Sequence, residues 1–300
     1  MALLLGDAGE TFSVPSHRTS TNGRASPFEE AVAMIASENR RLFRSVPDLI
    51  RFLAQREEPG LYMLIDHVST LSLDRIEEGL KRRGLRGQLR FTYEMPSESL
   101  IIKYMPGVFH CVTALGFGIE IIAKVAQLPG HSHRSVMGLG TAQFEVPGLI
   151  KKQGDCGIKP NSRVLATDWP SLMIEAGYSE TLQQLRLDAK IWLIHSAGRT
   201  KIVIIIKIAA DRNSFDVERW ELVPNTQTRS TRSTRSTPPL VPEVVQAFQI
   251  QRNGTVHPAN SQLIIPYLKI FDNPHPDAAD ILFTTNDLAA LGAHLFGGLQ

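Results

Sequence analysis

Residues 171–208 read SLMIEAGYSETLQQLRLDAKIWLIHSAGRTKIVIIIKI and indicate the fold class. Ser171–Glu175 is an apolar segment that ends in an acid, and Ser179–Leu182 supplies hydroxyl groups suited to a helix entry. The helix is expected to end at Gly198. Lys201–Ala209 is almost continuous in Ile and Val, which is typical of a strand covered on both faces. The stretch therefore predicts a strand, a helix and a second strand within a mixed sheet, an α/β (α+β) fold flanked by helices.

The residues around this stretch predict further elements. Alternating apolar side chains in Gln88–Tyr93 and the apolar run within Ser99–Tyr104 indicate a hairpin, and Val108–Leu128 carries the apolar stripe of a helix. Further strands are expected at Ala142–Val146, Gly157–Val164, Val217–Leu222, Ala247–Gln251 and Gln262–Leu268, and a closing helix at Asp287–Phe296.

Composition shifts suggest five regions. Residues 1–26 have few large apolar groups and are expected to be a disordered leader. Residues 27–87 show helical spacing, and 88–222 form the expected α/β core. Residues 223–241 contain Arg-Ser-Thr three times and are expected to be a low-complexity linker. Residues 242–300 are expected to complete or flank the core.

The overall composition is that of a globular protein without a dominant charge. The chain is 43% hydrophobic and 21% charged, and its formal charge is +2, so attraction to nucleic acid must come from local patches. Two cysteines cannot form a disulfide framework, and no disulfide-linked partner is expected. The apolar start Met1–Leu5 is too short for a signal peptide, and no run is long enough to span a membrane. An intracellular protein of the cytoplasm or nucleus is expected, and a homo-oligomer is compatible with the sequence.

Two acids stand at strand ends that the fold should bring together. Asp155 lies just before the strand at Gly157–Val164, and Glu175 closes the apolar segment that follows. Pairing of these strands would place two hard oxygen ligands side by side, as a divalent cation requires. Lys152 and Lys159 flank Asp155 and are candidate substrate contacts. The structural alternatives are a turn-forming aspartate and a solvent-facing glutamate at a strand end.

This arrangement resembles the PD-(D/E)XK nucleases, and within them a fungal branch related to bacterial putative restriction endonucleases. An acid on a hairpin, a second acid about twenty residues further on, a helix and a strand are similar to the core of that superfamily. The resemblance spans roughly residues 88–295 and is carried by Met105–Pro106 with His110, Gly154–Pro160, Trp169–Glu180, Leu185–Trp192, Lys201–Ile208, Asp280–Phe283 and Asp287–Leu288.

The resemblance implies a metal-dependent nuclease that binds nucleic acid. It implies Asp155 and Glu175 as the catalytic acids and metal ligands, with the carbonyl oxygen of Ala176 as a third ligand for Mg²⁺ or Mn²⁺. It also places Gly177 where the family motif has lysine. Another lysine must then act, and Lys190 in the following helix is the catalytic candidate.

The choice of lysine stays open at this point. Helical spacing puts Lys190 outside the buried stripe of its helix, so Lys201 and Lys207 are alternatives on one face of the later strand. Lys201 is also a candidate substrate contact, as is His110 at the start of a helix, whose structural alternative is a capping residue.

Three hypotheses of function follow from the sequence. The first is a nuclease that hydrolyses phosphodiester bonds in DNA or RNA. The second is a catalytically inactive nuclease-fold module that binds nucleic acid or protein, and the third is an accessory protein of an unrelated pathway. They differ in whether the carboxylates of Asp155 and Glu175 converge on one sheet edge beside basic side chains.

Overall fold

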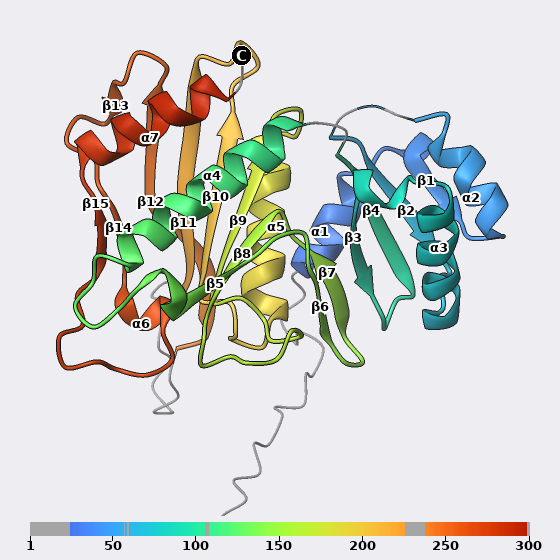
Figure 1. Ribbon diagram of the computed structural model, residues 1–300. Helices are drawn as coiled ribbons and strands as arrows, with labels where there is room; N and C mark the ends of the chain where they lie inside the picture. The colour runs from blue at the N-terminus through green and yellow to red at the C-terminus, as the bar shows by residue number, and fades with distance from the viewer. Residues whose placement is uncertain (1–24, 57, 59, 106–107, 226–237, 299–300) are drawn as a thin grey trace, which may run out of the picture.

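The computed structural model describes residues 25–56, 58, 60–105, 108–225 and 238–298. Within this part of the chain, two β-sheets lie side by side and each is packed against helices (Figure 1). The mixed α/β fold predicted from the sequence is therefore confirmed. Almost all of the expected leader and most of the Arg-Ser-Thr linker lie outside the described residues.

The central sheet has seven strands in the order β13-β12-β11-β10-β9-β8-β5. They are β5 (Val136–Leu139), β8 (Cys156–Pro160), β9 (Leu172–Gly177), β10 (Ile202–Ile208), β11 (Ser214–Pro224), β12 (Leu240–Gln251) and β13 (Val256–His257). Only β9 and β10 pair in parallel, because α5 (Leu182–His195) carries the chain back between them. The strand, helix and strand predicted from residues 171–208 all form.

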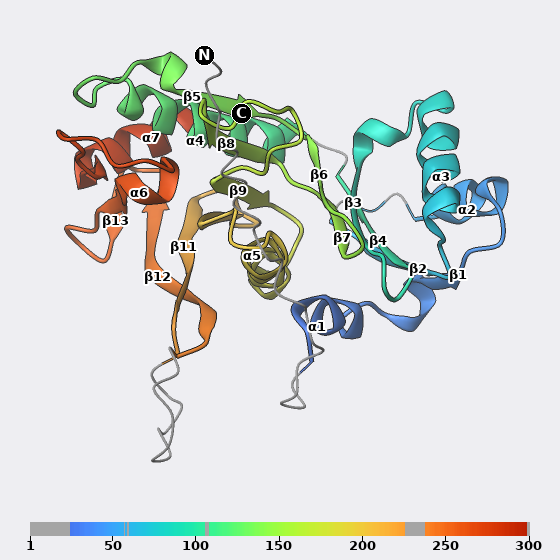
Figure 2. The same ribbon diagram turned by 90° about the horizontal axis from the view of Figure 1, so that it is seen from below.

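Strand β10 is covered on both faces, as its sequence predicts. Its even-numbered isoleucines lie in the core beneath α4 (Val108–Val125), whereas Val203 and Ile205 lie in the core beneath α5. Figure 2 shows α4 and α5 on opposite faces of the sheet. The same alternation applies to β9, so Ile174 faces α4 and Met173 faces α5.

The N-terminal sheet has six strands in the order β1-β2-β4-β3-β7-β6. They are β1 (Arg40–Leu42), β2 (Tyr62–Asp66), β3 (Leu89–Glu94), β4 (Ser99–Tyr104), β6 (Gln143–Val146) and β7 (Ile150–Gln153). Helices α2 (Val46–Leu53) and α3 (Thr70–Arg82) cover one face, and α1 (Pro27–Ala33) packs between the other face and α5. Short 3-10 turns lie at Ser37–Asn39, Arg86–Gln88 and His133–Ser135.

This sheet corrects the expectation of a purely helical region over residues 27–87. The three helices are present, but β1 and β2 lie between them. Strand β2 has only five residues, and periodicity cannot distinguish so short an apolar run from a helical turn. Its pairing with β4 along Tyr62–Ile65 decides the matter.

The predicted hairpin of β3 and β4 forms, but it belongs to the N-terminal sheet instead of the expected core. Strand β3 pairs with β7, and β7 leads directly into β8 of the central sheet. The chain therefore crosses from one sheet to the other at Gln153–Asp155. This crossing places Asp155 at the junction of the two sheets.

The C-terminal region both extends and flanks the central sheet. Strands β11 and β12 form a long hairpin in which Pro224 pairs with Leu240, so the ends of the expected linker are strand residues. Strands β14 (Leu263–Ile265) and β15 (Ile281–Phe283) make a separate two-stranded sheet next to α6 (Tyr267–Ile270) and α7 (Thr285–Gly297). Helix α7 packs against α4 and β12.

Candidate functional site

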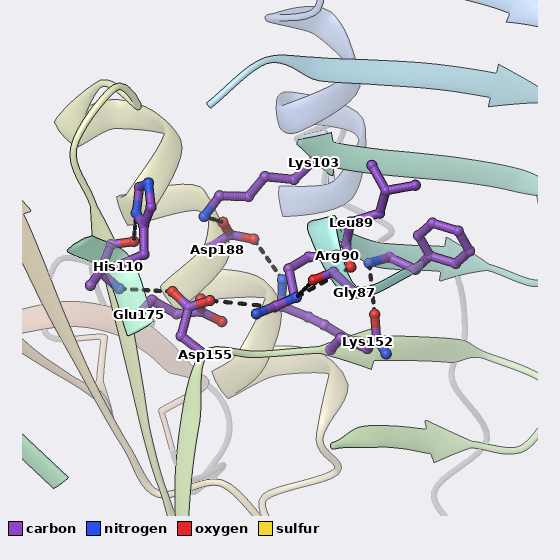
Figure 3. A network of polar contacts seen from close by, with 12 residues as sticks. Gly87, Leu89, Arg90, Lys103, His110, Lys152, Asp155, Glu175 and Asp188 are labelled. Carbon is purple, nitrogen blue, oxygen red and sulfur yellow. Dashed lines mark hydrogen bonds and ion pairs between the residues drawn. The ribbon is translucent and has the colours of Figure 1, made fainter. Parts of the chain in front are cut away.

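Asp155 and Glu175 meet on one face of the central sheet. Strands β8 and β9 are antiparallel with Cys156 opposite Ile174, and Asp155 and Glu175 each lie one residue beyond this last pair. Both side chains are buried on the face that α5 covers. The convergence that the sequence predicts for these two acids is present in the structure (Figure 3).

The Asp155 carboxylate is held from two sides. Its Oδ2 accepts a hydrogen bond from the Ala176 amide at 3.1 Å, and its Oδ1 lies 3.5 Å from Nε of Arg90 on β3. The first contact comes from the central sheet and the second from the N-terminal sheet. Asp155 therefore connects the two sheets.

The Glu175 carboxyl favours its protonated form. Trp192 of α5 donates a hydrogen bond from Nε1 to Glu175 Oε1 at 2.5 Å. Burial, and then the charges of Asp155 and Asp188, raise the pKa of Glu175 to about 8, although Lys152 and Lys103 oppose this rise. A neighbouring acid raises the pKa of a buried carboxyl group because two negative charges repel each other strongly where water is excluded.

Asp188 of α5 lies at the centre of the ion pairs between the sheets. Its Oδ1 accepts from Lys152 Nζ at 2.6 Å, and its Oδ2 accepts from the Tyr62 hydroxyl at 3.0 Å. Lys103 Nζ lies 4.0 Å from the same Oδ2. Burial alone would raise the pKa of Asp188, but the two ammonium groups and these hydrogen bonds hold it below its ordinary value.

Glu180, in the loop before α5, makes the second buried ion pair. Lys103 Nζ lies 2.9 Å from Glu180 Oε1, and His110 Nδ1 lies 3.8 Å from Oε2. The charges of Lys103 and then His110 hold the pKa of Glu180 below its ordinary value against the effect of burial. For Lys103, burial opposes its ammonium form, but Glu180 and its other partners raise its pKa well above the ordinary value.

The remaining predicted residues occupy different places. His110 of α4 lies at the site, with Nδ1 3.1 Å from the Ala176 carbonyl oxygen. The structure does not bring Lys190, Lys159 or Lys201 to the acid pair. Lys190 pairs with Glu30 of α1 at 3.2 Å, Lys159 donates to the Leu165 carbonyl, and Lys201 donates to the Leu268 carbonyl at 3.0 Å and pairs with Asp272.

A side chain at position 177 would crowd its neighbours. A Cβ atom there would lie 2.9 Å from Leu185 Cδ1 and 3.0 Å from Glu180 Oε2. Lys207 stands opposite Gly177 on β10, but its Nζ donates to the Tyr178 carbonyl at 2.6 Å. The cations nearest to Glu175 come instead from the N-terminal sheet.

Four members of the cluster were not predicted as site residues: Asp188, Glu180, Lys103 and Arg90. For Asp188 there was a signal, because it lies three residues after Leu185 and four before Trp192, on the buried stripe of α5. For Lys103 the signal was weaker, since it alternates with the core residue Ile102 and so belongs to the opposite face of β4. Nothing local indicated that this face meets the acids.

The cluster is tightly closed. Arg90, Lys103 and Lys152 line a small space together with Tyr62, Glu175 and Asp188, and this space accommodates about one water molecule. The whole cluster contains four acids and three cations. The acids are Asp155, Glu175, Glu180 and Asp188, and the cations are Arg90, Lys103 and Lys152. Leaving His110 aside, their charges balance when one acid is protonated, and the raised pKa of Glu175 identifies that acid.

The chemistry of the oxygen donors is of the kind a hard divalent cation uses. Asp155, Glu175 and the Ala176 carbonyl would supply oxygen ligands, and Mg²⁺ commonly uses one or two carboxylates with water or substrate completing its shell. A cation would also relieve the repulsion that raises the pKa of Glu175. Among the described residues, no three His, Cys, Asp or Glu side chains are grouped as metal ligands.

A close approach at Gly154 supports the acid pair. A Cβ atom there would lie 2.5 Å from Met173 Sδ and 2.8 Å from Trp192 Cζ2, so Gly154→Ala must displace the partner of Glu175. We expect a loss of about 1–3 kcal/mol in the free energy of unfolding, measured by urea denaturation. Gly140→Ala is the matched control, because a Cβ atom there meets nothing within 4 Å. Equal losses in the two variants would contradict the close approach.

The fold and this cluster define a mixed α/β protein whose buried acid pair faces cations from a second sheet. No protein-family model and no curated protein sequence matches the chain. None of the described helices is long and apolar enough to cross a membrane. Cys111 and Cys156 are free thiols.

Proposed function

We propose that the protein is a metal-dependent, nuclease-like phosphodiesterase with a restriction-endonuclease-like core. The observation that carries the proposal is the burial of Asp155 and Glu175 close enough for the charge of Asp155 to raise the pKa of Glu175. The helix and the parallel strand β10 follow in the order that the resemblance to PD-(D/E)XK nucleases implies.

In this proposal the chain holds the cation and orients what surrounds it. Asp155, Glu175 and the Ala176 carbonyl would hold Mg²⁺ or Mn²⁺, which when bound supplies Lewis-acid activation of water and of the scissile phosphate. The Ala176 amide and Trp192 fix the two carboxylates by hydrogen bonds at 3.1 and 2.5 Å. His110, 3.1 Å from the Ala176 carbonyl oxygen, fixes the third ligand.

The first test is cation binding. Isothermal titration calorimetry with Mn²⁺ at pH 8 is expected to show one site in the wild-type protein and none in Asp155→Asn or Glu175→Gln, because each variant removes a charged ligand. Glu145→Gln is the matched control, since Glu145 lies on β6 and its side chain is 44% exposed. Unchanged Mn²⁺ binding in both Asp155→Asn and Glu175→Gln would show that these acids do not hold the cation.

The second test is hydrolysis of labelled DNA and RNA in Mn²⁺. Cleavage is expected from the wild type and from Lys190→Met, whose ammonium pairs with Glu30 away from the acids, and is expected to be lost in Asp155→Asn. Cleavage by all three proteins, Asp155→Asn included, would point to a contaminant and remove the proposal.

A second candidate is a catalytically inactive nuclease-fold module that binds nucleic acid. It is favoured by Gly177, which stands where the motif has lysine, and by the small space at the acids. Mn²⁺ binding and nucleic-acid binding without any cleavage would support this candidate over the phosphodiesterase.

A further inference from the structure

Three cations lie together on one face of the N-terminal sheet. Arg90 of β3 and Lys103 of β4 are directly opposite each other, and Lys152 of β7 is opposite Thr92, the next residue of β3 on that face. We call Arg90, Lys103 and Lys152 the cation patch. Lys103 and Lys152 point toward Asp188 of α5, and Arg90 points toward Asp155 (Figure 3).

The stability of the sheet does not account for the patch. Like charges directly opposite each other on neighbouring strands are destabilising, and burial of Lys103 and Lys152 adds a desolvation cost. Elsewhere on the same face, Leu64 and Ile101 pack against α1 with apolar side chains. A well-packed apolar interface is often as stable as a buried ion pair, or more so.

The acids opposite the patch hold their oxygens within ion-pair distance of its ammonium groups. Asp188 Oδ1 lies 2.6 Å from Lys152 Nζ, and Glu180 Oε1 lies 2.9 Å from Lys103 Nζ. These are ordinary lengths for an ammonium group bound to an anionic oxygen. The patch also adjoins Glu175, where position 177 supplies no ammonium group.

We propose that the cation patch binds the phosphodiester backbone of nucleic acid, and that Asp188 and Glu180 occupy it in the ligand-free molecule. This inference rests on the proposed function for the identity of the ligand. The space at the patch accommodates only about one water molecule, so binding requires the two sheets to part and exchanges carboxylate partners for phosphate. The acids therefore act as a self-inhibitory contact.

The test measures binding without hydrolysis, on the full chain in EDTA. Fluorescence anisotropy of a labelled DNA duplex and of an RNA oligonucleotide is recorded as a function of salt. Lys103→Met and Lys152→Met are each expected to weaken binding about five- to tenfold at 0.1 M salt and to lower the slope of log K against log salt by about 1. Lys151→Met is the matched control, because Lys151 pairs with Glu145 on the β6–β7 hairpin.

The sign of the Asp188→Asn effect separates this inference from a purely structural role. Removing the competing charge is expected to tighten binding severalfold, while the asparagine can still bond to Lys152 and Tyr62. Lys152→Met in the Asp188→Asn background tests the lysine without leaving an unpaired acid. Weaker binding by Asp188→Asn, or an unchanged salt slope in both lysine variants, would overturn the inference.

The outcomes keep the two proposals apart. If the lysine variants still cleave nucleic acid and bind it with unchanged affinity, the phosphodiesterase proposal holds and the proposed binding by the cation patch is wrong. If the lysine variants lower the salt slope of nucleic-acid binding but the wild-type protein neither binds Mn²⁺ nor cleaves, binding by the cation patch holds and the phosphodiesterase proposal is wrong.

Discussion

Replacing Glu175 by glutamine is expected to raise the free energy of unfolding at pH 8 by about 4 kcal/mol. The pKa of Glu175 is raised to about 8 from an ordinary value of 4.5 by burial and by Asp155 and Asp188. Between these values the folded protein keeps a proton that the unfolded chain has lost, so wild-type stability falls as pH rises through this window. Glutamine mimics the protonated acid and still accepts from Trp192.

The measurement is urea unfolding of both proteins in EDTA from pH 4.5 to 8.5. The gain from Glu175→Gln should be less than about 1 kcal/mol near pH 4.5 and should grow until it levels off above pH 8. Glu145→Gln, at an exposed carboxylate, should change stability by less than about 0.5 kcal/mol throughout. A Glu175→Gln gain that is the same at every pH would show that the acid is not held in its protonated form.

The effect of Mn²⁺ on the free energy of unfolding tests the protonation of Glu175 independently. A divalent cation favours the ionised carboxylate, so Mn²⁺ should stabilise the wild-type protein more at pH 8 than at pH 6, in line with the fraction of Glu175 that has lost its proton. Glu175→Gln should gain nothing from the metal at either pH. Stabilisation of that variant by Mn²⁺ would place the cation elsewhere.

The parts of the molecule that follow local rules could be predicted from the sequence. The Ile and Val run of β10, the capped start of α5 and its end near Gly198 each depend on neighbouring residues. The proximity of Asp155 and Glu175 was also predictable, because both acids lie next to the antiparallel pairing of two strands that are adjacent in the chain, β8 and β9. Short-range pattern was sufficient for this half of the site.

The other half depends on contacts that no local pattern specifies. Lys103 lies 77 residues from Glu180, its ion-pair partner, and Tyr62 lies 126 residues from Asp188. Their meeting requires β3 to pair with β7 and the chain to cross between sheets at Gly154. Periodicity describes the faces of each strand but does not state which faces meet.

The prediction for Lys190 was likewise correct about its local surroundings and wrong about its distance from the acids. Helical spacing placed it outside the buried stripe of α5, which is correct, since it pairs with Glu30 of α1 and keeps a quarter of its side chain exposed. Position 177 still needed a substitute cation, and the lysines considered for that role were those that follow Glu175 in the chain, whereas Lys152 was expected only as a substrate contact. The candidates in space, Lys103 and Lys152, lie on strands that precede the acids.

Asp188→Ala is expected to lower the free energy of unfolding by about 3–5 kcal/mol, because it leaves the buried ammonium of Lys152 without its acid. Lys103 and the Tyr62 hydroxyl lose a partner as well. Lys152→Met in the same chain removes the stranded charge, so the double variant should be more stable than the sum of the single losses predicts. We expect a coupling energy of about 2–3 kcal/mol from the double-mutant cycle, measured by urea denaturation at pH 7.

A second pair on the same helix supplies the matched comparison. Lys190 and Glu30 lie 3.2 Å apart with side chains 25% and 30% exposed, and their cycle should give less than about 1 kcal/mol. The difference follows from desolvation, since a partly exposed charge that loses its partner is rehydrated whereas Lys152 is not. Additive losses at Lys152 and Asp188 would mean that water reaches this ion pair, and the two sheets would then part without a ligand.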